Sequence, residues 1–203
     1  MIKLYDYPRC PFCKKVRVAL TEKGLQYEKV LVDLRRKEQK NPDFLRLNPY
    51  GKVPVLQDGD TVIYESTVIN EYLEERYPNP PLMPSDPAGK AWVRIWVDFC
   101  EQHFGTPWFN LMREIVFKRD GSSNQEVLRE SREEIKRYFE EINERLEGRD
   151  YLAGKYSLAD VAFTPRIATF EDLGIEVDPK LKNVTAWIER IRARPSYSAV
   201  QKY

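Results

Sequence analysis

Two cysteines at close spacing form the part of the sequence best suited to chemistry. Cys10 and Cys13 belong to a Cys-Pro-Phe-Cys motif that follows a short apolar segment and opens a stretch of helical periodicity. Pro11 fits the first position of a helix, because the amide at that position has no partner within the helix. We therefore expect Cys10 at the helix N-cap, where unpaired amides and the helix dipole favour a thiolate. With Arg9 and Lys14 nearby, the pKa of Cys10 should lie below the value of about 8.5 for an unperturbed cysteine.

The same motif has two other interpretations. The thiols can be buried structural groups, or they can bind zinc together with Cys100 and His103, which show the same spacing on a predicted helix. A Cys-x-x-Cys pair between a strand and a helix favours thiol chemistry over metal binding in a reducing compartment. We therefore expect no metal, and we assign Cys100 and His103 to the packing of an aromatic-rich helix.

Two further segments could bind a ligand beside the thiol. Val53-Pro54 lies in the first strand of a predicted hairpin, and Glu65-Ser66 lies where the hairpin passes into a helix. Ser66 and the unpaired amides of the helix start would bind a carboxylate, and Glu65 would bind an ammonium group; a plain helix cap is the alternative. Together with Cys10 these segments describe a cleft for a molecule with a thiol, a peptide backbone, a carboxylate and an amine. Glutathione has all four groups.

The elements that must position these residues alternate between strand and helix over residues 1–77. The expected order is a strand at 2–5, a helix from 11 to about 24, a strand at 27–32, a weaker helix at 38–47, a hairpin of 52–56 and 61–64, and a helix at 65–76. Prolines make 78–86 a linker, and only helical stripes follow in 87–203. We therefore predict an α/β domain with a mixed four-stranded sheet, then an all-helical domain.

Composition excludes several classes of function. Lys and Arg (33) nearly cancel Asp and Glu (32) in 203 residues, so the chain carries no large field for nucleic acid or an anionic membrane. The sequence contains no signal-peptide pattern and no apolar stretch long enough to span a bilayer, and three cysteines make no disulfide framework. We therefore expect a cytoplasmic protein without nucleic-acid or membrane partners. Ser157-Leu-Ala-Asp160 predicts a capping box, which is a structural feature.

The order of these motifs resembles that of the cytosolic glutathione transferases. The matching segments are the Cys-Pro-Phe-Cys motif, 48–56, 64–66, the proline linker and 157–161, which together span essentially the whole chain. The resemblance implies a thioredoxin-like domain with a cis Val53–Pro54 bond beside the cysteines, where the Val53 backbone pairs with an extended thiol peptide. The cysteine-type start is most similar to the omega class and related bacterial enzymes, whereas the Cys10/Cys13 pair resembles dithiol glutaredoxins.

The resemblance also implies a role for each site residue. Cys10 would form mixed disulfides with glutathione, Glu65 and Ser66 would bind its γ-glutamyl end, and a lysine would bind its glycine carboxylate. Cys13 would allow an internal disulfide, so monothiol and dithiol routes both stay open. The glutathione-binding residues implied in this way are Lys37, Lys40, Lys52, Val53, Pro54, Glu65 and Ser66.

The sequence thus predicts an enzyme for glutathione-dependent thiol transfer, or for reduction of mixed disulfides and small oxidised substrates. One alternative is conjugation of glutathione to electrophiles, and another is a non-catalytic interaction protein similar to the stringent starvation protein. Tyr5 or Tyr7 could supply a hydroxyl in place of the thiolate, which we rank lower. The family implies a homodimer. An acceptor pocket between the domains would be lined by Trp96, Phe99, Phe104 and Trp108.

Overall fold

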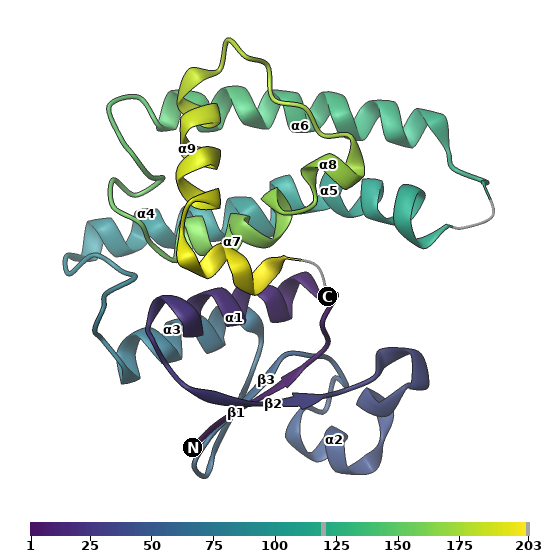
Figure 1. Cartoon of the computed structure of the whole chain (residues 1–203), viewed down its shortest axis with the longest axis vertical. Coiled ribbons are helices and arrows are strands. Elements are labelled where there is room, and N and C mark those ends of the chain that lie inside the picture. The colour runs from purple at the N-terminus through teal and green to yellow at the C-terminus, as the bar shows by residue number, and fades with distance from the viewer. Residues whose placement is uncertain (119–120, 202–203) are drawn as a thin grey trace. The chain divides into compact units, whose positions relative to one another are not determined.

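The computed structural model describes residues 1–118 and 121–201, and it divides into two compact units (Figure 1). The first unit comprises Met1–Leu82 and the C-terminal segment from Pro195, and the second comprises Met83–Arg194. The division at Leu82 lies within the linker expected at 78–86. The C-terminal segment differs from the expectation, because it packs with the first unit and does not belong to the helical one.

A four-stranded mixed sheet, in the order β2-β1-β3-β4, forms the centre of the first unit. β1 (Ile2–Asp6) pairs in parallel with β2 (Tyr27–Leu31) and antiparallel with β3 (Val55–Asp58), and β3 pairs antiparallel with β4 (Thr61–Tyr64). Alternate residues of β1 are buried, as expected for a strand with one face toward a core. Gly59 turns the β3–β4 hairpin with a φ of 60°, a conformation that favours glycine.

Helices cover both faces of this sheet. α1 (Pro11–Glu22) and α3 (Ser66–Arg76) pack against each other on one side of the sheet, and α2 (Pro42–Leu47) lies on the other side (Figure 1). The apolar face of α1 is buried through Val16, Ala19 and other residues of its stripe. α1 therefore anchors the cysteine motif at its N-terminus to the core of the unit.

The chain between β2 and β3 departs from the single helix predicted at 38–47. Two 3₁₀ turns, η1 (Leu34–Arg36) and η2 (Glu38–Lys40), precede α2. Pro42 explains the break, because proline lacks an amide hydrogen and is tolerated only in the first turn of a helix. Pro42 accordingly occupies the first position of α2.

The last described segment of the chain returns to the first unit. The 3₁₀ segment η5 (Pro195–Val200) packs on α1, and its yellow ribbon lies beside that helix in Figure 1. Lys14 Nζ donates a hydrogen bond to the Val200 carbonyl at 2.9 Å, and the Ser196 hydroxyl donates to Glu22. The helix that carries the cysteines is therefore covered by the opposite end of the sequence.

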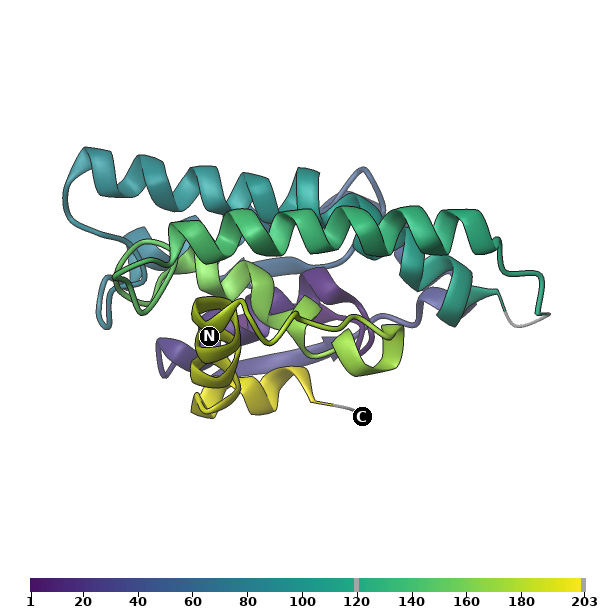
Figure 2. The same ribbon diagram turned by 90° about the horizontal axis from the view of Figure 1, so that it is seen from above.

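Within residues 83–118 and 121–194 the second unit is helical, apart from isolated β-bridges in 151–155. It opens with a continuous helical run in which α-helical and π-helical segments alternate, and α6 runs alongside this run (Figure 2). Its elements are α4 (Pro87–Asp98), η3 (Phe99–Phe104), α5 (Gly105–Leu111), η4 (Met112–Phe117), α6 (Gln125–Arg145), α7 (Leu158–Ile167), α8 (Phe170–Leu173) and α9 (Lys182–Arg192).

Aromatic rings fill the core of the helical unit. The Phe104 ring lies 5.7 Å from that of Phe139, 5.3 Å from that of Phe163 and 6.1 Å from that of Phe170, measured between centroids. Phe163 also meets Trp187 edge-on at 5.3 Å. Such edge-to-face contacts add to the stabilisation from burying the rings. The observed architecture confirms the predicted class, a thioredoxin-like sheet domain followed by an all-helical domain.

The predicted capping box at the start of α7 is confirmed. The Ser157 hydroxyl accepts from the amide of Ala159 at 3.3 Å, and Asp160 Oδ2 accepts from the amide of Ser157 at 3.0 Å. Asp160 Oδ1 also accepts from Trp187 Nε1 at 2.9 Å, which joins α7 to α9. Burial raises the pKa of Asp160 to about 6. No helix among the described residues combines the length and the apolar character needed to cross a bilayer.

Candidate functional site

Cys10 occupies the predicted N-cap of α1, with Pro11 at the first helical position. Its backbone is extended (φ −72°, ψ 121°), and its own amide donates to the Tyr7 carbonyl at 3.0 Å. The half-buried Cys10 Sγ lies 4.0 Å from the Val53 carbonyl oxygen. The thiol accepts no capping hydrogen bond of ordinary geometry, although the helix amides lie close to it. The motif therefore places the Cys10 sulfur at the start of a helix and beside the loop before β3.

The pKa of Cys10 is lowered, mainly by the thiol of Cys13, and less by the backbone amides of Cys13 and Phe12. Burial and the charge of Asp6 act in the opposite direction. The predicted direction is confirmed, and so is the predicted contribution of the amides at the helix start. Lys14 is not among the main groups that lower this pKa, because its side chain extends to the carbonyl of Val200 at 2.9 Å. The exposed Arg9 is likewise not among the main groups that lower this pKa.

Cys13 is the buried partner in this pair. It is fully buried in a cluster with Val32, Phe44, Val53 and Val55, and its Sγ accepts from the amide of Tyr7 at 3.5 Å. Burial, followed by the neighbouring Cys10, raises the pKa of Cys13 well above the ordinary range of a thiol. Cys13 therefore stays protonated at neutral pH and can donate to the sulfur of Cys10.

The loop before β3 brings the Val53 backbone to the thiol. The Val53–Pro54 peptide bond is cis, and both residues are buried. Asn48 organises this loop, because its Nδ2 donates to the Lys52 carbonyl at 2.8 Å and its Oδ1 accepts from the Tyr50 amide at 3.0 Å. This turn explains why β3 begins at Val55, later than the strand expected at 52–56. The side chain of Lys52 is exposed.

The two candidate lysines lie in different settings. Lys40 Nζ donates to the Tyr50 carbonyl at 3.3 Å, and a Cβ atom at Gly51 would meet this ammonium group at 2.8 Å. Lys37 is exposed between η1 and η2, with a left-handed φ of 57°. Lys40 is thus the candidate that lies over the loop leading to Val53.

Gln39, which the sequence analysis did not single out, lies beside Lys40. Its Oε1 is buried and accepts no hydrogen bond from any residue that the structure describes. A buried acceptor without a donor is costly, and such groups occur where a ligand or water supplies the donor. A glutamine in a short 3₁₀ turn carries no signal in the sequence that could have identified it.

Glu65 and Ser66 lie where β4 passes into α3. Glu65 has a φ of 69° and a ψ of 113°, a backbone conformation that L-residues with a side chain rarely adopt. Its exposed side chain makes no capping hydrogen bond, which disfavours the interpretation of these residues as a plain helix cap. Ser66 is buried at the first position of α3, among the unpaired amides of the helix start.

Of the two tyrosines considered as alternatives to the thiolate, Tyr5 has its hydroxyl engaged and Tyr7 contacts the cysteines through its backbone. The Tyr5 hydroxyl donates to Gln57 Oε1 at 3.3 Å, and its ring meets Phe44 edge-on. Tyr7 packs against the cluster around Cys13, and its backbone binds both cysteines. These contacts give each tyrosine a role in supporting the motif.

The four aromatic residues assigned to an acceptor pocket are buried in the helical unit. The rings of Trp96 and Phe99 lie 4.9 Å apart, and Trp108 Nε1 donates to Thr169 at 2.9 Å. Phe104 lies in the aromatic core described above. These contacts are all internal to the helical unit, and the assignment of a pocket stays a prediction.

Cys100 and His103, the remaining residues of the zinc alternative, also belong to the helical unit. Cys100 is buried, whereas His103 is exposed and its ring lies 5.6 Å from that of Phe99. Among residues 1–118 and 121–201, no three His, Cys, Asp or Glu side chains are grouped so that they could hold a metal ion. The structure therefore offers no set of ligands for the zinc alternative within these residues.

Comparison with known proteins agrees with this geometry. Residues 4–81 match the family model "Glutathione S-transferase, N-terminal domain", and residues 99–195 match "Glutathione S-transferase, C-terminal domain". Glutathione S-transferase 3 of Zea mays is 32% identical over 97% of this chain and 91% of its own length. A stringent starvation protein A homolog of Histophilus somni is 31% identical over 92% of this chain and 83% of its own length.

A solved structure extends the likeness to three dimensions. The theta-class glutathione S-transferase of Xanthomonas axonopodis pv. citri with glutathione bound superimposes with a TM-score of 0.90 and 25% identity, over 100% of this chain and 98% of that one. The two family models together account for both units, in the order in which the structure has them. The chain belongs to the cytosolic glutathione transferase superfamily.

Proposed function

We propose that this protein is a glutathione-dependent thiol transferase in which Cys10 is the attacking thiol. The observation that carries the proposal is the setting of Cys10, a half-buried thiol of lowered pKa at a helix N-cap and 4.0 Å from the Val53 carbonyl. A thiolate, and not a thiol, attacks a disulfide. The named relatives and the glutathione-bound neighbour support glutathione as the co-substrate.

The proposed reaction has two steps of thiol–disulfide exchange. The Cys10 thiolate attacks the glutathione sulfur of a mixed disulfide, a Cys10–glutathione disulfide forms, and the substrate leaves as a thiolate that takes up a proton. The thiolate of a second glutathione then attacks the glutathione sulfur of this disulfide, which releases glutathione disulfide and restores the Cys10 thiolate. Cys13 takes no covalent part in this monothiol route. Its protonated thiol stabilises the anion of Cys10 by a hydrogen bond.

Charged side chains and backbone amides beside Cys10 would bind the glutathione molecule. We assign its γ-glutamyl ammonium group to Glu65 and the adjacent carboxylate to Ser66 and the amides that start α3. The strained backbone of Glu65 supports this role, because strain of this kind gathers at ligand sites. Lys40 would bind the glycine carboxylate in preference to Lys37, and the buried Gln39 oxygen would accept from a peptide amide of the ligand.

Two alternatives differ from this proposal in what they predict for turnover. Conjugation of glutathione to an electrophile is favoured by the likeness to plant glutathione S-transferases. A non-catalytic role is favoured by the likeness to stringent starvation protein A homologs. A scaffold has no need of a thiol with a lowered pKa beside a strained, charged backbone turn, so the geometry of Cys10 and Glu65 supports an enzyme.

Turnover with two substrates separates these functions. The purified protein is assayed with glutathione and either a cysteine–glutathione mixed disulfide or a chloro-dinitrobenzene electrophile. We expect turnover of the mixed disulfide, a loss of about three orders of magnitude in Cys10→Ser, and most of the rate retained in Cys13→Ser. Cys100→Ser is the matched control, because it removes a buried thiol outside this site, and it should retain the full rate.

Each contrary outcome points to another function. Conjugation without disulfide exchange would favour the electrophile route, and no turnover by a folded protein would favour a scaffold. A full rate in Cys10→Ser would overturn the mechanism and would make the hydroxyl of Tyr5 or Tyr7 the next candidate. Accumulation of a mixed disulfide with protein substrates in Cys13→Ser would establish the dithiol route.

The proposal also covers the oligomeric state of the protein and its location in the cell. We propose a homodimer in the cytoplasm, with an acceptor pocket to which the helical unit contributes. Each unit exposes apolar side chains suited to a subunit contact, such as Val68 on α3 and Trp92 and Ile95 on α4. Sedimentation equilibrium tests the dimer, since a single monomeric species at micromolar concentration would contradict it.

A further inference from the structure

A buried ion pair lies directly beside the thiol motif and takes no part in the proposed chemistry. Asp6 is the last residue of β1, Arg17 is in α1, and their side chains are 0% and 1% exposed. Arg17 Nη1 lies 3.2 Å from Asp6 Oδ2. Burying two charges is costly unless their geometry and remaining hydrogen bonds compensate for the lost water. Stability alone therefore does not explain why this ion pair is buried next to the thiol motif.

Arg17 joins three parts of the motif through one guanidinium group. It lies four residues after Cys13 on α1, so the two side chains project from the same face of the helix. While Nη1 binds Asp6, Nη2 donates to the Pro8 carbonyl at 3.0 Å. Pro8 belongs to the short loop between β1 and Cys10. Arg17 thus fixes this loop from within α1, and the bond from the Cys10 amide to Tyr7 closes the turn from the other side.

Asp6 also acts on both thiols through its charge. Its negative charge raises the pKa of Cys10 and of Cys13, so an uncompensated Asp6 would oppose the thiolate. The cations that face Asp6 are Arg17 from α1 and Lys29 from β2, whose Nζ lies farther away, at 3.8 Å, and is partly exposed. The other oxygen of Asp6, Oδ1, is buried without a hydrogen bond within residues 1–118 and 121–201. Arg17 is therefore the main group that balances this charge.

We propose that Arg17 is a positioning residue for Cys10, which holds the Pro8 carbonyl and compensates the charge of Asp6. It touches no substrate and acts through these two groups. The inference rests on the proposed function only in that ionisation of Cys10 matters for turnover. Loss of Arg17 would leave only the partly exposed Lys29 to balance the buried carboxylate near the sulfur, and it would release the loop that places Cys10 at the helix start.

The test is the rate of Cys10 alkylation by iodoacetamide as a function of pH, followed on the Cys10 peptide by mass spectrometry. In Arg17→Met we expect the midpoint to rise by about one pH unit, or about a tenfold slower alkylation at neutral pH. In Asp6→Asn, which keeps the shape of the side chain, we expect the midpoint to fall below that of the wild type. The double variant should lie between the two single variants.

Further measurements distinguish positioning from a merely structural role. Arg17→Lys restores the charge but not the planar fork that reaches Asp6 and Pro8 together, so its midpoint should lie between those of the wild type and Arg17→Met. A purely structural pair would change the unfolding midpoint in all variants without this ordered series. An unchanged midpoint in Arg17→Met, or a raised one in Asp6→Asn, would overturn the inference.

The inference stays testable if Arg17→Met does not fold or if the wild type shows no thiol transfer. Should Arg17→Met fail to fold, Asp6→Asn alone still tests the sign of the charge effect. If the alkylation midpoints follow the expected order but the wild type shows no thiol transfer, the proposed function is wrong and the inference about Arg17 is still supported.

Discussion

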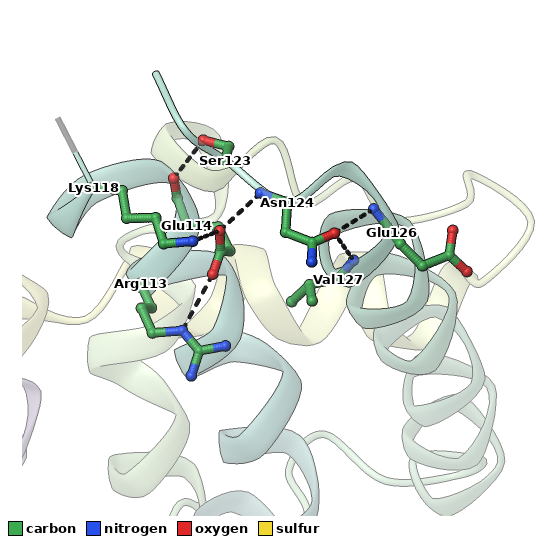
Figure 3. Close-up of polar contacts among 7 residues, drawn as sticks. All are labelled: Arg113, Glu114, Lys118, Ser123, Asn124, Glu126 and Val127. Carbon is green, nitrogen blue, oxygen red and sulfur yellow. Dashed lines mark hydrogen bonds and ion pairs between the residues drawn. The ribbon is translucent and has the colours of Figure 1, made fainter. Parts of the chain in front are cut away.

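Buried polar groups around Glu114 in the helical unit have hydrogen-bond partners, whereas some at the thiol site of the first unit have none within the part of the chain that the structure describes. Glu114, at the end of the opening helical run, is 2% exposed, yet its carboxylate is fully engaged (Figure 3). It accepts from the amide of Asn124 at 2.9 Å, from Lys118 Nζ at 2.7 Å and from Arg113 Nε at 3.2 Å. These bonds, that of the Asn124 amide above all, lower the pKa of Glu114 to about 2.

The same cluster joins two helices. The Ser123 hydroxyl donates to the Glu114 carbonyl at 2.7 Å, and Asn124 Oδ1 caps α6 by accepting from the amides of Glu126 and Val127 (Figure 3). Both carboxylate oxygens and the carbonyl oxygen of Glu114 thus have partners within the unit. The arrangement therefore holds the end of η4 beside the start of α6 and leaves neither carboxylate oxygen of Glu114 without a partner.

The thiol site is incomplete by comparison. The Gln39 oxygen and one oxygen of Asp6 are buried without partners among the described residues, and Glu65 holds a strained backbone. Cys10 keeps a lowered pKa although burial opposes it. Satisfied polar groups stabilise a fold, whereas unsatisfied or strained ones cost free energy and persist where function requires them. The comparison predicts that changes at satisfied carboxylates such as Glu114 and Asp160 affect stability, and that changes at the thiol site affect binding.

The largest effect on stability is expected at Asp160, another satisfied carboxylate of the helical unit. Asp160→Ala removes the acceptor of Trp187 Nε1 and of the amides of Leu152 and Ser157. We expect the free energy of unfolding to fall by about 3 kcal/mol, because a cap is lost and buried donors stay unpaired. Urea unfolding measures this change, with the exposed Asp98→Ala as control. A loss no larger than that of the control would contradict the comparison.

Glu65 should show the opposite pattern. Glu65→Gly removes the charge proposed to bind the ammonium group and also relieves the strained φ of 69°. We expect glutathione affinity to fall by about 1.5–3 kcal/mol, or one to two decades, while the free energy of unfolding rises by about 1 kcal/mol. Calorimetric titration and urea unfolding measure the two quantities. The exposed Glu75→Ala on α3 is the control, and Ser66→Ala should lose affinity in the same way. Unchanged glutathione affinity in both site variants would mean that Glu65 and Ser66 only form the start of α3 and bind no ligand.

The third effect concerns the charge of Glu114 and depends on pH. Because its pKa is lowered in the folded state to about 2, its contribution to stability is present above the unfolded value of about 4.3 and is lost as the pH falls toward 2. Glu114→Gln should therefore be less stable than the wild type at pH 7, and the difference should shrink on acidification. Unfolding of both proteins at several pH values tests this, with the exposed Glu147→Gln as reference. A difference independent of pH would contradict the assignment.

Local patterns in the sequence predicted local structure well. The N-cap at Cys10, the hairpin at Gly59 and the Ser157 capping box all follow from residue types within a few positions. The interactions that decide the chemistry were harder to predict. Lys14 binds Val200, which is 186 residues away, and the strain at Glu65 depends on how β4 meets α3.

The effect of Cys13 on Cys10 was also missed, for a physical reason. Its thiol lowers the pKa of Cys10 because Cys13 itself is buried in a cluster that includes Phe44 and Val55. Burial of this kind depends on residues from α2 and β3, which the spacing of the two cysteines does not reveal. The sequence motif therefore predicted that the pKa of Cys10 is lowered, and the fold was needed to identify the main cause of that shift.

The ionisation of Cys10 is the central claim, and the rate of its alkylation against pH tests it most directly. The wild-type protein should show a midpoint below the value of about 8.5 for an unperturbed cysteine. Cys13→Ala should raise that midpoint, because the hydrogen bond from Cys13 is the largest contribution to the lowered pKa. A wild-type midpoint at or above 8.5 would contradict the account.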